Sequence, residues 1–70
     1  MKQETLRLIH EEAMVCASEI KEFGPNRKYE WKLYGYLACM CDIGYISYAE
    51  KLKIELHYRA YFKELNTGRN

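Results

Sequence analysis

Hydrophobic residues recur at intervals of three and four positions in the first third of the chain, a pattern typical of one face of an α-helix. The stripe consists of Leu6, Ile9, Ala13, Cys16, Ile20 and Phe23. The opposite side is mainly charged. The pattern predicts a long helix that begins at Lys2 or Thr5, ends at Phe23 and packs along one seam. Gly24 and Pro25 follow, and this pair is typical of a helix end.

The second segment, residues 27–43, has no charged residue from Leu33 to Cys41. A helix with apolar side chains on every side is expected to be buried on more than one side. Gly44 can adopt the left-handed conformation that closes a helix, with Tyr45 folding back onto Met40. Ser47 and Glu50, three positions apart, then form the capping-box pattern that starts a new helix. The sequence therefore predicts a tight helix hairpin at residues 42–50.

The third segment, residues 48–65, carries two apolar stripes on nearly opposite sides of the predicted helix. The first stripe consists of Ala49, Leu52, Leu56 and Ala60, and shares its side with Tyr45; the second consists of Ile54, Tyr58, Tyr61 and Leu65, with Phe62 beside it. One small core cannot cover both stripes, so we assign the first to the core and the second to a protein interface. The predicted interface residues, with an aromatic residue of the second helix added, are Trp31, Ile54, Tyr58, Tyr61, Phe62 and Leu65.

The length of 70 residues fits one domain, and a chain this short buries only about 60% of its unfolded surface. We predict an all-α protein, a three-helix antiparallel bundle formed by a single helical domain at residues 1–65, with a polar C-terminal tail at residues 66–70. The three cysteines are odd in number, and Met1 leads directly into charged residues without an apolar signal core. We therefore expect reduced thiols and a cytoplasmic location. No apolar run approaches the roughly 18 residues of a membrane span.

Residues that could carry chemistry are few. His10 and Glu11 begin like a zinc-protease helix motif, but Met14 stands where the second histidine should be. Cys39 and Cys41 would point about 160° apart on a helix, so they cannot share one metal ion. The chain has two serines and no glycine-rich phosphate loop. We expect no catalytic residue, metal site, cofactor or small-molecule substrate.

A small DNA-binding regulator is the alternative function. Two helices joined at Gly44 superficially match the helix-turn-helix hairpin, and Arg27, Lys28 and Lys32 could contact the phosphate backbone. However, Met40 lies where that motif needs a small residue, and Glu50 lies where it needs a buried apolar one. The net charge of +1 is also low for a nucleic-acid binder. Nucleic-acid binding is therefore the weaker of the two hypotheses.

Aromatic residues are abundant, with seven tyrosines, two phenylalanines and one tryptophan. Such side chains are enriched where proteins bind other proteins. The sequence therefore predicts a small, non-catalytic protein–protein interaction module. Chains of this kind are typical of phage or mobile-element inhibitors and adaptors that occlude a larger protein, although no family motif supports that step. A homodimer is the simplest way to cover the second stripe, but the sequence leaves self-association and binding to another protein open.

Overall fold

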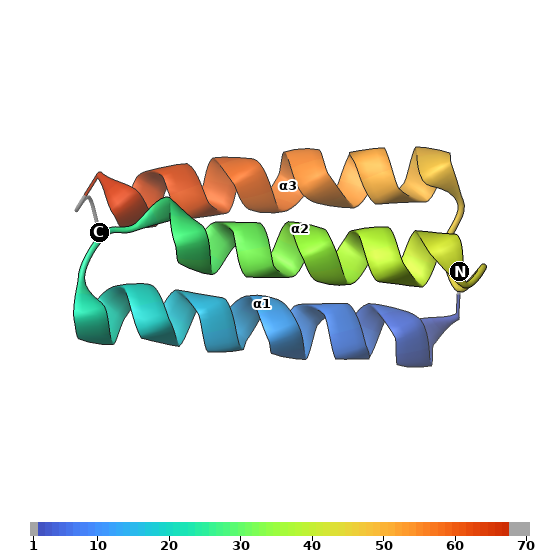
Figure 1. The fold of residues 1–70 in the computed structure, drawn as a ribbon, viewed down its shortest axis with the longest axis horizontal. Coiled ribbons are helices and arrows are strands. Elements are labelled where there is room, and N and C mark those ends of the chain that lie inside the picture. The colour runs from blue at the N-terminus through green and yellow to red at the C-terminus, as the bar shows by residue number, and fades with distance from the viewer. Residues whose placement is uncertain (1, 68–70) are drawn as a thin grey trace.

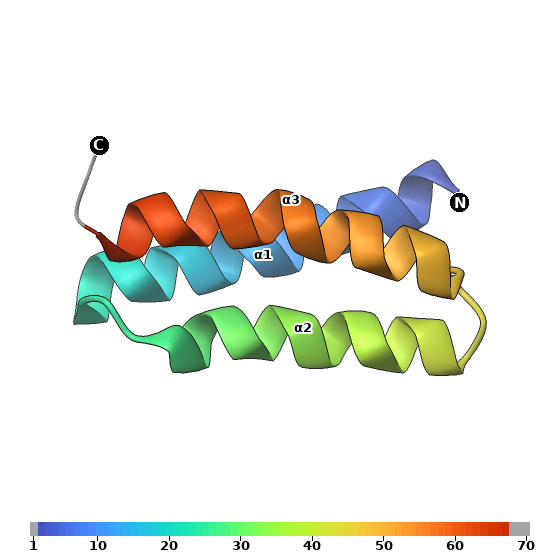
Figure 2. The ribbon, with the colours of Figure 1, turned by 90° about the horizontal axis from the view of Figure 1, so that it is seen from above.

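The computed structural model describes residues 2–67. It contains three helices, α1 (Gln3–Phe23), α2 (Arg27–Asp42) and α3 (Tyr48–Asn66). The helices run in alternating directions (Figure 1), and α2 lies to one side of α1 and α3 (Figure 2). The prediction of an all-α protein with three helices is confirmed. Of the predicted tail, Asn66 belongs to α3, and residues 68–70 lie outside the described part of the chain.

The core lies where the three helices face one another. Its buried apolar members are Ile9, Ala13, Cys16, Ala17, Ile20, Leu33, Leu37, Met40, Ile46 and Phe62. The central members of the predicted α1 stripe are thus in the core. Leu6 and Phe23, at the two ends of that stripe, are exposed. Phe23 instead stacks on Tyr29, with ring centroids 6.2 Å apart.

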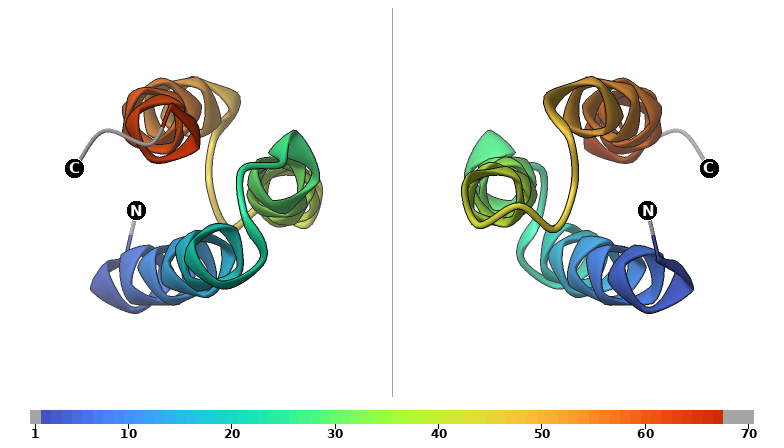
Figure 3. Two further views of the ribbon diagram at one scale, coloured as in Figure 1. Left: turned by 90° about the vertical axis from the view of Figure 1, so that its left-hand side faces the viewer. Right: turned by 90° about the vertical axis from the view of Figure 1, so that its right-hand side faces the viewer.

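Helix α2 is buried along one face only. Leu33, Leu37 and Met40 are buried, whereas Trp31 and Cys39 are exposed. The expectation that α2 is buried on more than one side is therefore wrong. The reason is the arrangement of the neighbours: α1 and α3 both lie on the same side of α2 (Figure 3).

The turn between α2 and α3 has the predicted closing and starting bonds. The Gly44 N–H donates to the Cys41 carbonyl (3.1 Å) and the Tyr45 N–H to the Met40 carbonyl (2.9 Å), a Schellman closure. Gly44 has a φ of +86°, which favours glycine. The Ser47 Oγ accepts from the Glu50 N–H (3.1 Å), and the Glu50 Oε1 accepts from the Ser47 N–H (2.8 Å). These hydrogen bonds fix the direction in which α3 leaves the turn.

The stripe of α3 assigned to the core is not the one that the structure buries. Phe62 is completely buried, and the partly buried residues that pack against the core with it are Ile54, Tyr58, Tyr61 and Leu65. The stripe assigned to the core is exposed instead: Ala49, Leu52, Leu56 and Ala60. The core assignment of that stripe is therefore wrong. The larger side chains of the other stripe remove more apolar area from water, so that stripe turns inward.

Candidate protein-binding surface

Exposed apolar side chains concentrate on α3 and on the turn before it. Among residues 2–67, nine large hydrophobic residues are exposed, and five of them lie between positions 43 and 56: Ile43, Tyr45, Tyr48, Leu52 and Leu56. Leu56 is the most exposed of the nine, at 69%. One row of side chains, which we call the outer face of α3, consists of Ala49, Leu52, Leu56 and Ala60. Single exposed hydrophobic residues are common, but a continuous row of them is typical of a binding surface.

Contacts on both sides of α3 hold its outer face toward solvent. On the side of α1, the Tyr58 hydroxyl lies 3.2 Å from the His10 Nδ1. Burial, together with the neighbouring Tyr61, raises the pKa of Tyr58 above its ordinary value. On the side of α2, the guanidinium of Arg59 lies over the ring of Tyr34, 5.5 Å from its centroid. These contacts fix the rotation of α3 about its axis, and the outer face faces neither neighbour.

The outer face changes from apolar to basic along its length. Lys63 lies seven positions after Leu56 and eleven after Leu52, so at about 100° per residue it continues the same row. Lys53 and Arg59 flank the row at its sides, and the exposed Glu64 lies eleven positions after Lys53 on the same flank, so that cations outnumber carboxylates here. No carboxylate within residues 2–67 forms an ion pair with Lys53, Arg59 or Lys63.

A cavity lies beside the basic end, between the start of α2 and the end of α3. Its volume is about 340 Å³, and its lining residues are Arg27, Glu30, Arg59, Lys63, Asn66 and Thr67. Three of these side chains are cationic and one is anionic. The cavity therefore carries an excess of positive charge and has room for a small acidic group.

Glu30 forms the buried side of this cavity and is only 3% exposed. Its carboxylate accepts a hydrogen bond from the Tyr34 hydroxyl and lies 3.8 Å from the Arg27 Nε. Burial and the bonded Glu30 carboxylate raise the pKa of Tyr34 above its ordinary value. Sequence reasoning missed Glu30, although it lies three positions before Leu33 and seven before Leu37, on the buried face of α2.

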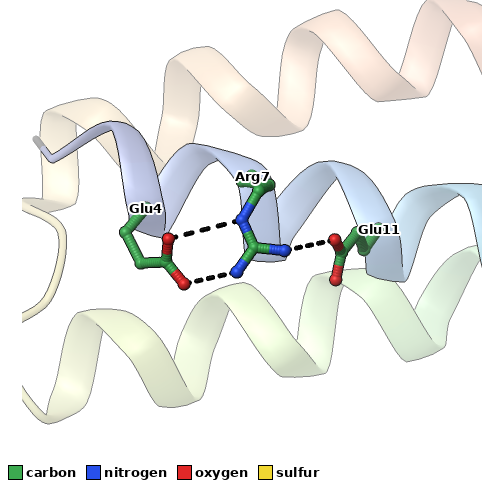
Figure 4. Close-up of polar contacts among 3 residues, drawn as sticks. All are labelled: Glu4, Arg7 and Glu11. Carbon is green, nitrogen blue, oxygen red and sulfur yellow. Dashed lines mark hydrogen bonds and ion pairs between the residues drawn. The ribbon is translucent and has the colours of Figure 1, made fainter.

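Part of the exposed surface of α1 is occupied by ion pairs. Arg7 lies between Glu4 and Glu11 and contacts both carboxylates (Figure 4). The guanidinium hydrogen bond and charge lower the pKa of Glu4. Between helices, the Lys32 Nζ lies 2.8 Å from a Glu19 carboxylate oxygen. Arg7 is thus already neutralised on the surface of α1, whereas Lys21 forms no ion pair within residues 2–67.

The structure separates the six predicted interface residues. Trp31 is 60% exposed, on the side of α2 away from Leu33. The rings of Tyr58 and Tyr61 pack against Phe62, with centroid distances of 6.3 and 5.5 Å. Ile54 and Leu65 are partly buried beside them. Of the six, only Trp31 is exposed, and its role in binding a partner stays a prediction.

The described residues 2–67 contain no group of three or more His, Cys, Asp or Glu side chains that could hold a metal ion. Within the same range, none of the helices has the length and hydrophobicity needed to cross a membrane. No protein-family model, curated protein or solved structure matches the chain. A functional assignment therefore has to come from the geometry of the surface.

Proposed function

We propose that the protein is a non-catalytic binding module that docks another protein on the outer face of α3. The observation that supports the proposal is the exposed row of Leu52 and Leu56, flanked by Ala49 and Ala60. The core is already filled by the opposite side of α3, so folding of the chain alone leaves this row in water. Burying it against a partner is favourable, at about 25 cal/mol for each Å² of apolar surface.

The spacing of the row suits a helical partner. Residues 49, 52, 56 and 60 are separated by three, four and four positions, the pattern by which one helix packs along another. The two alanines are small and permit a close approach of the partner's backbone. Such a module would act as an adaptor, or as an inhibitor that covers part of its target.

Capture of a binding partner from a cell lysate tests the proposal. The double variant Leu52→Glu and Leu56→Glu should lose a partner that the wild-type chain captures, because two carboxylates would have to be buried at the contact. Val15→Glu is the control, since Val15 is half exposed on α1. Circular dichroism should show unchanged helicity in both variants. Capture that survives the double variant, or is lost equally in the control, contradicts the proposal.

The DNA-binding alternative receives less support from the arrangement of α2 and α3. The two helices lie side by side and antiparallel (Figures 1 and 2), whereas helix-turn-helix motifs join helices at about 90–120°. Arg27, Lys28 and Lys32 lie at the start of α2, and the turn lies at its far end. Lys32 is also paired with Glu19. A mobility shift with mixed DNA that weakens steeply with salt would favour the alternative.

A further inference from the structure

We infer that the partner presents an acidic amphipathic helix, with its apolar side chains on Leu52 and Leu56 and its carboxylates toward Arg59 and Lys63. The inference rests on the proposed function and adds the chemistry of the partner. It follows from the change along the outer face of α3, which is apolar near its start and basic near its end.

Unpaired cations are the first argument. Four of the ten basic side chains among residues 2–67 form ion pairs: Arg7, Arg27, Lys32 and Lys51. Of the six that form none within this range, three lie beside the apolar row or continue it: Lys53, Arg59 and Lys63. Complementary charge on a partner would guide its approach and fix its register.

The cavity at the basic end is the second argument. Arg27 lies near the carboxylate of Glu30 and Arg59 lies over the ring of Tyr34, so a single carboxylate faces three cations in this cavity. A volume of about 340 Å³ accommodates the end of a glutamate or aspartate side chain. A carboxylate placed there would neutralise charge that the chain itself leaves uncompensated.

A second copy of this chain fits the surface poorly. Two α3 helices packed in parallel about a two-fold axis would bring Lys53, Arg59 and Lys63 of one copy near the same three cations of the other. Antiparallel packing would place Lys63 beside the apolar start of the other copy's row, which offers no carboxylate. Helix α1 offers no apolar row in exchange. Its exposed hydrophobic residues, Leu6, Val15 and Phe23, are eight or nine positions apart and point in different directions. We therefore expect the partner to be a different protein.

Two synthetic amphipathic helical peptides test the inference directly. Both carry leucine at the same positions, and the polar positions of one are glutamate while those of the other are lysine. Each peptide is titrated into the ¹⁵N-labelled protein and followed by chemical-shift changes. The glutamate peptide should bind at least about tenfold more tightly at low salt, with shifts centred on residues 48–63, and the difference should shrink at high salt.

Charge variants with equal changes in net charge provide the control. Lys53→Glu with Lys63→Glu should reverse the preference for the glutamate peptide. Lys21→Glu with Lys28→Glu changes the net charge equally, on α1 and at the start of α2, and should preserve the preference. If both pairs act alike, the effect is one of overall charge and the inference is wrong.

The remaining outcomes separate the inference from the proposed function. If both peptides bind equally and Leu56→Glu abolishes that binding, the acidic partner is refuted, but the outer face remains a binding surface. Failure of the glutamate peptide to bind refutes the inference, as does tighter binding to vesicles containing phosphatidylserine. If either peptide binds away from residues 48–63, and Leu56→Glu does not affect that binding, the proposed function is contradicted as well.

Discussion

The orientation of α3 can be tested by comparing one residue from each of its faces. Phe62 is completely buried, and Leu56 is 69% exposed. Had the outer face formed the core, a change at Leu56 would destabilise the protein and a change at Phe62 would not. The structure predicts the opposite order for Phe62→Leu and Leu56→Ala.

The expected magnitudes follow from burial. Replacing a buried phenylalanine by alanine costs about 3–5 kcal/mol, and leucine retains much of the lost volume, so Phe62→Leu should cost about 1–2 kcal/mol. Each kcal/mol shifts the Tm of a domain this small by about 4–8 °C. Leu56→Ala should change the free energy of unfolding by less than about 0.5 kcal/mol, because alanine is a strong helix former and little surface is buried there.

Thermal and urea unfolding followed by circular dichroism measure both variants under the same conditions. We expect the Tm of Phe62→Leu to fall by roughly 5–15 °C and that of Leu56→Ala to stay within a few degrees of the wild type. An equal or larger fall for Leu56→Ala would show that the outer face of α3 is buried in solution and would refute the assignment.

Three further predictions concern the thiols, the buried carboxylate and the turn. Iodoacetamide should label the exposed Cys39 before the buried Cys16. Burial and nearby Glu12 raise the pKa of Cys16 from 9.0 to about 11. The protonated Cys16 thiol therefore stabilises the folded protein at low pH, and this contribution is lost as the pH rises through that interval. Mass spectrometry of the labelled sites checks the order, and equal rates would contradict it. Tyr34→Phe should cost about 1–3 kcal/mol in urea unfolding because the buried Glu30 carboxylate loses its donor; an unchanged midpoint would count against this hydrogen bond. Ser47→Ala should cost about 1 kcal/mol in the same assay by removing the capping box, and Ser47→Thr should retain most of the stability.

Local sequence signals predicted the helices and their ends well. The caps at Gly44 and Ser47 depend on residues within a few positions of one another, so their chemistry can be read without knowing the fold. The predicted bounds of α2 and α3 differ from the observed ones by one residue at their C-terminal ends. The buried centre of α1 also followed from spacing alone, because its apolar stripe has no competing stripe of similar size.

The rotation of α3 about its own axis could not be predicted from the spacing of its apolar residues. Both of its faces have helical spacing, and the choice between them is made by how well each fills the space beside α1 and α2. Side-chain volume was the available signal, since Tyr58, Tyr61 and Phe62 bring far more apolar area than Leu52 and Leu56. The basic cavity was not predictable, because it joins the start of α2 to the end of α3.

Site-specific photo-crosslinking in cells tests the central claim, that the outer face of α3 binds a partner, most directly. A photoreactive amino acid is placed at Leu56, and at Val15 as a control of similar exposure on α1. The account predicts an adduct of defined mass from position 56 and none of that mass from position 15. Adducts from position 15 without any from position 56 would contradict it.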